Sequence, residues 1–187
     1  GIIDYSEVCN KFAELIKKIN PKSSIITNSE VISFTKGIDC KIFTRNESFL
    51  SKNLIFCGGL FSDRLAKIDK VNKNMRIVGF RGDYFKLNDS AKKKIRNLVY
   101  PIPNPKFPFL GVHFTRMVDG SVECGPNAVF TFKREGYGKL DFNFKDTYDA
   151  LSYQGTWKLF FKNWKFGLNE YRRAFSKKLF LKELKKL

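Results

Sequence analysis

The side chains best suited to chemistry lie in one short stretch, residues 111–130. It contains the only histidine in the sequence, His113, which alternates with apolar neighbours in a pattern typical of a β-strand. Arg116 follows, and then a Gly-Pro-Asn turn that ends at Asn127. A titratable base, a fixed cation and an amide in one predicted hairpin are groups that bind small anions. We interpret the stretch as part of a pocket for an anionic small molecule; the alternative is a core histidine satisfied by a backbone carbonyl.

A second candidate site is the pair Gly58 and Gly59. The apolar run 53–57 precedes the pair, and Ser62 and Asp63 follow at the predicted start of a helix. A run without polar alternation is typical of a strand buried on both faces, as in a parallel sheet. Glycines between a strand and a helix let a ligand approach the backbone closely, although many such turns carry two glycines for structural reasons alone.

The first part of the chain predicts one helix and several short strands. Over Tyr5–Ile19, apolar residues recur at three- and four-residue spacing, which predicts an amphipathic helix. Asp4 or Ser6 is placed to cap its N-terminus. Short strands are predicted at residues 24–27, 30–35 and 40–44.

From residue 76 the pattern changes to consecutive strands, which form an antiparallel sheet when no helices intervene. The end of the chain has a helical pattern, and we interpret its aromatic residues Trp157, Phe160, Phe161 and Trp164 as core. The predicted strands are residues 76–81, 84–87, 98–101, 110–116, 122–125 and 128–133. The predicted helices are residues 147–153, 156–164, 168–176 and 178–187.

Composition limits the classes of partner. The 187 residues carry 35 Lys and Arg against 18 Asp and Glu, a formal net charge of +17, which suits an anionic partner. The basic residues are spread through the sequence without an RNA-binding aromatic motif, a zinc finger or an Arg-rich arm, so nucleic acid is not favoured. An anionic membrane surface fits the charge better. The positive charge also has an explanation without a partner. Abundant Lys, Asn, Ile and Phe with little Ala fit an AT-rich coding bias, and many of the lysines would then be solvent-exposed residues without a binding role.

Cysteine usage and hydropathy bear on the compartment. No apolar run approaches the roughly 18 residues that a membrane-spanning helix needs, and no signal-peptide pattern is present. Four cysteines without a Cys-x-x-Cys pair, together with one histidine, predict no metal site and instead buried free thiols in a reducing cytoplasm. These cysteines are Cys9, Cys40, Cys57 and Cys124.

Three stretches together resemble the L-2-hydroxyglutarate oxidase family of the FAD-dependent D-amino-acid-oxidase superfamily. Residues 111–130 are similar to its substrate-domain signature, residues 54–66 to a flavin-contacting strand-turn motif, and residues 80–84 (Phe-Arg-Gly-Asp-Tyr) to its Arg-Gly element. The resemblance implies an α+β fold. Residues 1–75 would be part of a FAD-binding α/β domain, and residues 76–187 an antiparallel-sheet substrate domain with C-terminal helices.

The same resemblance implies roles for individual residues. L-2-hydroxyglutarate would be oxidised to 2-oxoglutarate by hydride transfer to FAD, with His113 as the general base. The implied substrate-binding residues are Arg81, Tyr84, Arg116 and Asn127. The implied cofactor-binding residues are Val31, Cys57, Gly58 and Gly59.

Two glycine-rich motifs of the superfamily are missing from these residues: the strand–Gly-x-Gly-x-x-Gly–helix that holds the pyrophosphate, and a later stretch at the flavin ring. We therefore expect an internal fragment with an incomplete FAD site, which alone binds FAD poorly and is inactive. The expected location is the cytoplasm, with peripheral contact at the inner membrane. The alternative is a non-catalytic basic domain that binds an anionic partner or membrane surface.

Overall fold

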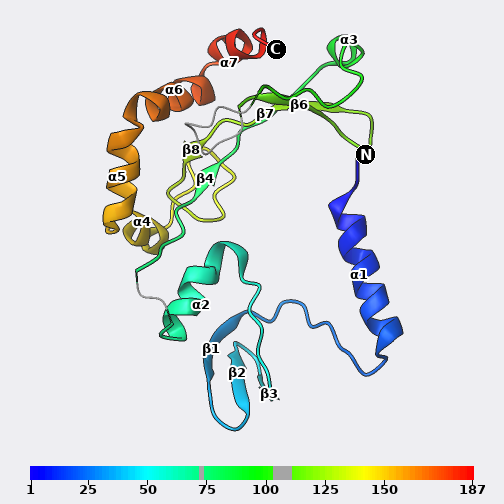
Figure 1. Ribbon diagram of the computed structural model, residues 1–187, viewed down its shortest axis with the longest axis vertical. Helices are drawn as coiled ribbons and strands as arrows, with labels where there is room; N and C mark the ends of the chain where they lie inside the picture. The colour runs from blue at the N-terminus through cyan, green and yellow to red at the C-terminus, as the bar shows by residue number, and fades with distance from the viewer. Residues whose placement is uncertain (72–73, 103–110) are drawn as a thin grey trace. The chain divides into compact units, whose positions relative to one another are not determined.

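A computed structural model describes residues 1–71, 74–102 and 111–187. They form two compact units, Asp4–Ile77 and Val78–Leu187, the second joined by Gly1–Ile3. Both units contain helices and small antiparallel sheets (Figure 1). The α+β class predicted from the sequence is therefore confirmed. The assignment of residues 1–75 to cofactor and 76–187 to substrate stays a prediction.

The first unit begins with helix α1 (Tyr5–Ile19), with the bounds that the sequence predicts. Asp4 caps it, because its Oδ1 accepts a hydrogen bond of 2.8 Å from the backbone N–H of Ser6. None of the α1 residues is buried, although the apolar positions share one face. The spacing thus identifies the helix, whereas its burial depends on what packs against it.

A three-stranded antiparallel sheet follows, made of β1 (Val31–Thr35), β2 (Cys40–Thr44) and β3 (Ser48–Ser51) in that order. The first two strands confirm the predictions at 30–35 and 40–44, and β3 was not predicted. Phe34 and Ile42 face each other across β1 and β2, and both are buried. This pair forms the centre of the sheet's apolar face.

Two predicted strands of this unit are wrong. Residues 24–27 and 53–57 belong to no strand. The second was expected to be buried on both faces, yet Ile55 is 86% exposed and Cys57 is also exposed. A strand needs the backbone of a neighbour for its hydrogen-bond ladder, and the described residues offer none to this segment.

The helix predicted after the glycine pair is confirmed. Gly59–Phe61 forms one 3₁₀ turn, and α2 (Ser62–Ile68) continues from it. Asp63 in the first turn of α2 accepts a 3.0 Å hydrogen bond from the backbone N–H of Ile77. This bond ties α2 to the last residue of the unit.

The second unit holds two small antiparallel sheets, ordered β5-β7-β6 and β4-β8. Strand β7 has the predicted bounds, whereas the other four strands are shorter than predicted. Segment 98–101 contributes one bridge, from Val99 to Phe114. Residue 110 of the predicted strand 110–116 lies outside the described residues. The bounds are β4 (Phe80–Arg81), β5 (Phe85–Lys86), β6 (His113–Arg116), β7 (Val122–Gly125) and β8 (Val129–Phe130).

Four helices at the end of the chain confirm the predicted helical region, with bounds shifted by a few residues. Asn143 and Ser176 cap two of them, because their side-chain oxygens accept from the N–H groups of Asp146 and Leu179. A short helix, α3, was not predicted. The helices are α3 (Asp89–Lys92), α4 (Phe144–Leu151), α5 (Gln154–Lys162), α6 (Trp164–Phe175) and α7 (Lys177–Leu184).

The core of the second unit lies between the β5-β7-β6 sheet and α7. Alternation along β7 puts Val122 and Cys124 on one face, and both are almost completely buried. The ring of Phe180 on α7 packs 4.6 Å from the ring of Phe85 on β5. Burial also raises the pKa of the Cys124 thiol above its usual value.

The aromatic residues of α5 and α6 correct one prediction. Trp157, Phe161 and Trp164 are 44%, 73% and 59% exposed, so they are not core. Of the four residues, Phe160 packs inward, with its ring 5.2 Å from that of Phe130. Helical spacing shows which residues share a face, but it does not show whether that face is covered.

The four cysteines are free thiols, as predicted, but the expected burial holds for Cys124 alone. Cys40 is half-buried, and Cys9 and Cys57 are exposed. None of the described helices is both long enough and apolar enough to cross a membrane.

Candidate functional site

The first strand residue of β6, His113, is 8% exposed. Its Nδ1 lies 3.0 Å from the carbonyl oxygen of Gly111. A carbonyl only accepts hydrogen bonds, so in the neutral imidazole Nδ1 carries the proton and Nε2 keeps a lone pair. A hydrogen bond to a backbone carbonyl is what the core-histidine alternative predicts, but this bond involves only one of the two ring nitrogens. In the described part of the chain Nε2 has no hydrogen-bond partner, so it is able to accept a proton.

Two tyrosine rings lie beside this imidazole. The Tyr100 ring is 4.7 Å from the His113 ring, and the Tyr84 ring approaches edge-on at 6.5 Å. Tyr100 is not among the site residues that the sequence suggested. The antiparallel bridge between Val99 and Phe114 brings it opposite His113. The predicted consecutive strands 98–101 and 110–116 indicate such a pairing, but not the register that selects Tyr100.

The pairing of β6 with β7 brings Gly125, the first residue of the Gly-Pro-Asn turn, opposite His113. Gly125 is the strand partner of His113. A Cβ atom added to Gly125 would come within 2.7 Å of the Tyr84 ring and 2.8 Å of the Asp83 carbonyl oxygen. Glycine is therefore required here by the close approach of the two segments.

Tyr84 remains a hydrogen-bond donor at neutral pH. Burial raises the pKa of its phenol above the usual value, and the negative charge of Glu123 raises it further. The neutral phenol is the form that carries the proton. The hydroxyl group can therefore donate to an anionic ligand while it stays uncharged.

Asn127 is the most unusual polar residue of this cluster. It is 1% exposed, and its backbone N–H donates to the Asp83 carbonyl oxygen at 3.3 Å. Neither the Nδ2 nor the Oδ1 atom of its amide has a hydrogen-bond partner among the described residues. A buried amide left unpaired costs about 1–3 kcal/mol. The amide of Asn127 thus keeps one donor group and one acceptor that the described residues do not satisfy.

Arg81 lies in the same region, but its guanidinium is engaged with the protein. It is buried, and its Nε donates to Asp83 Oδ1 at 2.6 Å. Its Nη1 donates to the Gly138 carbonyl oxygen at 2.5 Å. The pair connects the segment before Tyr84 to the loop around residue 138.

Arg116 does not join His113. Residues three apart on a regular strand point to opposite faces, and here the two side chains have separate sets of partners. The guanidinium of Arg116 donates to the carbonyl oxygens of Lys92, Ile95, Arg96 and Gly120. It therefore binds the segment that follows α3.

The residues predicted to bind a cofactor lie in the first unit. Val31 opens β1 and is 37% exposed, and Cys57 is exposed. A Cβ atom on Gly58 would come within 2.4 Å of the Cδ1 of Leu65 on α2, a side-chain end that can move aside. Gly59 has a φ of +50°, and nothing lies within 4 Å of the position that its Cβ would take. Its backbone is open to a ligand.

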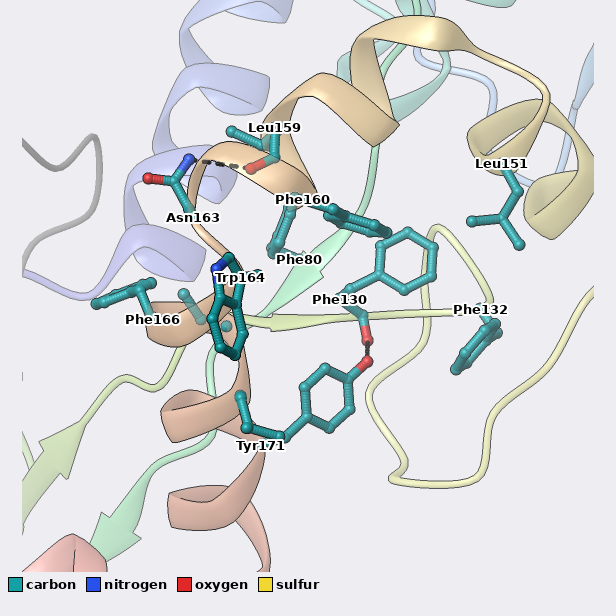
Figure 2. A pocket seen from close by; sticks show the side chains of 13 residues that line it. Phe80, Phe130, Phe132, Leu151, Leu159, Phe160, Asn163, Trp164, Phe166 and Tyr171 are labelled. Carbon is teal, nitrogen blue, oxygen red and sulfur yellow. Dashed lines mark hydrogen bonds between the residues drawn. The ribbon is translucent and has the colours of Figure 1, made fainter.

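A separate cavity of about 480 Å³ lies in the second unit, lined by residues of the β4-β8 pair and of α4, α5 and α6. Figure 2 shows aromatic rings around it and two polar side chains that are already hydrogen-bonded. The Tyr171 hydroxyl donates to the Phe130 carbonyl oxygen at 2.9 Å, and Asn163 Nδ2 donates to that of Leu159 at 3.0 Å (Figure 2). The cavity contains none of the predicted site residues.

Comparison with known proteins adds a family and several relatives. The family described as "FAD dependent oxidoreductase" matches residues 1–157. L-2-hydroxyglutarate dehydrogenase of Indibacter alkaliphilus is 43% identical over 100% of this chain and 47% of its own length. The mitochondrial protein of that name from Dictyostelium discoideum is 41% identical over 99% of this chain and 45% of its own. The Escherichia coli (strain K12) protein is 37% identical over 100% and 44%. The chain thus spans about half the length of the curated relatives it matches.

Proposed function

Because the chain belongs to the family of FAD-dependent oxidoreductases, we propose that it is part of a flavoenzyme that oxidises L-2-hydroxyglutarate to 2-oxoglutarate. The names of the relatives support this substrate. The observation that carries the proposal is the cluster in the second unit. There, a buried imidazole adjoins the Tyr84 ring, and its Nε2 has no hydrogen-bond partner among the described residues. The turn after its strand partner Gly125 carries the amide of Asn127, which these residues also leave unpaired.

The proposed reaction removes two hydrogens from the substrate, one from C2 and one from the hydroxyl group on C2, and each goes to a different acceptor. Bound FAD would supply the acceptor for the C2 hydrogen, which leaves with its electron pair as hydride. His113 Nε2 takes the hydroxyl proton as the C2–O bond becomes a carbonyl. The Nδ1–H bond to Gly111 holds the ring in the tautomer that leaves Nε2 free, and it stabilises the imidazolium that forms.

Tyr84 and Asn127 are the proposed donors to the oxygen atoms of the substrate. The Tyr84 ring contacts both His113 and its strand partner Gly125, and Asn127 follows Gly125 by two residues in the chain. Both side chains can donate without carrying a charge. Arg81 and Arg116 stay predictions as carboxylate ligands. The guanidinium groups of both residues already donate hydrogen bonds, to Asp83 or to backbone carbonyl oxygens. To bind a substrate carboxylate, each would have to break one of these bonds.

The proposed contacts for FAD are Val31, Cys57, Gly58 and Gly59. Gly59 supports the assignment most directly, because a backbone with φ of +50° and free space around it can approach a flat cofactor closely. The ring of Phe56 packs 4.7 Å from that of Phe34, which holds this segment against β1. The residues present therefore fit one wall of a flavin site.

Substituting Gly59 by alanine tests the flavin contact. Gly120 is a matched control, because its φ is +77° and its Cβ position is equally open. Alanine costs about 1–2 kcal/mol of backbone strain at either position. In a protein of the relatives' length that contains these residues, we expect Gly59→Ala alone to weaken FAD binding about tenfold, since its Cβ occupies the approach to the backbone. Fluorescence titration measures the affinity, and equal losses in both variants would remove Gly59 from the site.

The reaction itself is tested by reduction of bound flavin in the same full-length protein. Under anaerobic conditions, L-2-hydroxyglutarate should bleach the visible absorbance of the flavin. The D enantiomer presents its C2 hydrogen in the wrong direction and should leave the flavin oxidised. Bleaching by both enantiomers at one rate, or by neither, would contradict the proposal.

A cytoplasmic location with peripheral contact at the inner membrane is also proposed. The net charge of +17 supports attraction to anionic lipid, and nucleic acid is not favoured as a partner. The alternative function, a non-catalytic basic domain, predicts a protein that never holds flavin. The flavin titration therefore separates the two functions.

A further inference from the structure

The outward faces of α5 and α6 carry large apolar side chains. We call Trp157, Phe161, Trp164 and Leu168 the aromatic stripe, because they recur at intervals of four, three and four residues. They range from 44% to 73% exposed. The Trp157 and Phe161 rings are in contact, with their centroids 6.1 Å apart. A contiguous set of exposed apolar side chains such as the aromatic stripe indicates a surface that binds a membrane or another protein.

The charges beside the aromatic stripe have one sign. Lys158, Lys162 and Lys165 are exposed, and no Asp or Glu occurs between residues 154 and 168. The Lys165 Nζ lies 5.5 Å from the centre of the Trp164 ring. Tryptophan, phenylalanine and lysine on neighbouring helical turns are typical of helices that lie in the interface of an anionic bilayer. The interiors of protein–protein interfaces, by contrast, are poor in lysine.

The cavity of about 480 Å³ lies next to the aromatic stripe, because Trp164 and Leu168 also line it (Figure 2). Its volume falls within the range of roughly 300–1,000 Å³ found for small-molecule sites. Its wall is formed almost wholly by aromatic and aliphatic side chains, and the amide of Asn163 and the hydroxyl of Tyr171 already donate to the backbone. The part of a ligand that enters must therefore be hydrocarbon.

We propose that α5 and α6 form a membrane-binding surface for anionic phospholipid, and that the cavity receives an acyl chain of a bound lipid. The aromatic stripe enters the interface while the three lysines contact the headgroups. This assigns a surface to the peripheral location proposed above. It rests on the geometry of α5 and α6 and does not depend on the oxidation reaction.

Tryptophan fluorescence of the full chain tests the proposal directly, because both tryptophans of the 187 residues belong to the aromatic stripe. Vesicles of phosphatidylcholine with phosphatidylglycerol should shift the emission to the blue and carry the protein in flotation. Phosphatidylcholine alone should do neither, and salt should weaken the binding. Lipids brominated along the acyl chain should quench the emission. Flotation without a shift or quenching would overturn the proposal, as would no flotation.

Three variants assign the effect to residues. Phe161→Asp and the pair Lys158→Glu with Lys162→Glu should each weaken binding to the anionic vesicles about tenfold or more. Leu140→Asp is the matched control, because Leu140 is 91% exposed on the same unit and lies outside the stripe. It should bind as the unmodified chain does. Equal binding by Phe161→Asp and the control would overturn the proposal, as would a dimer in lipid-free solution that Phe161→Asp dissociates.

The cavity is tested with Gly167→Leu. Gly167 lines the cavity, sits inside α6 and has open space at its Cβ position, so leucine fills the cavity and favours the helix. We expect it to weaken vesicle binding several-fold and to reduce quenching by brominated chains, with a melting temperature equal to or above that of the unmodified chain. Binding and quenching equal to those of the unmodified chain would overturn the acyl-chain assignment.

Discussion

Replacing His113 by asparagine should lower turnover of L-2-hydroxyglutarate by about 10²–10⁴-fold in a protein of the relatives' full length. Asparagine retains an N–H group that can donate to Gly111, but it cannot accept the proton of the hydroxyl group. Flavin content and the melting temperature should stay close to those of the unmodified enzyme. Steady-state kinetics together with thermal unfolding measure the three quantities.

The opposite pattern would make His113 a core residue. In that case stability should fall by about 1–3 kcal/mol, because a buried polar contact is disturbed, and activity should fall only as folded protein is lost. Near-normal turnover in the His113→Asn enzyme would end the general-base mechanism. It would leave membership of the family untouched, since that depends on the match over residues 1–157.

Replacing Arg81 by methionine should destabilise the protein by about 3 kcal/mol. The side chains of Arg81 and Asp83 are 8% and 16% exposed, and the substitution leaves the carboxylate buried without its cation. Urea unfolding measures the loss. Arg81→Met combined with Asp83→Leu should recover most of it, because no isolated charge remains.

The same variant decides between two roles for Arg81. A carboxylate ligand would give a raised KM and little change in stability. The conservative Arg81→Lys would then also raise KM, because it keeps the charge and loses the two-pronged guanidinium. A loss of stability that the double variant reverses identifies Arg81 as a positioning residue for the segment containing Tyr84.

Elements that depend on local pattern could be predicted from the sequence, whereas those that depend on a distant partner could not. The helix α1 has its period and its Asp4 cap within its own residues, and β7 has its alternation. The apolar run 53–57 has a strand-like composition, but pairing requires a second backbone that this composition does not specify. Burial of Trp157 and Phe161 failed for a related reason, since periodicity does not reveal what covers a face.

The candidate site divides in the same way. His113 and the Gly-Pro-Asn turn belong to one predicted hairpin, so the pairing of His113 with Gly125 could be inferred. Tyr100 reaches the imidazole through one bridge between two consecutive predicted strands, and it was missed because the sequence does not fix the register of that pairing. Arg116 is close in sequence but lies on the other side of the strand, and its carbonyl partners could not be foreseen from its neighbours.

Gly125 limits how this hairpin can change over evolutionary time. Its φ is not positive, so the constraint is space alone: the Tyr84 ring and the Asp83 carbonyl occupy the place of a side chain. Every single-base change that replaces a glycine specifies a residue with a Cβ atom or stops translation. No amino-acid replacement at this position is therefore sterically neutral. A lineage could alter the residues around the imidazole one by one, while this position stays fixed as the others drift.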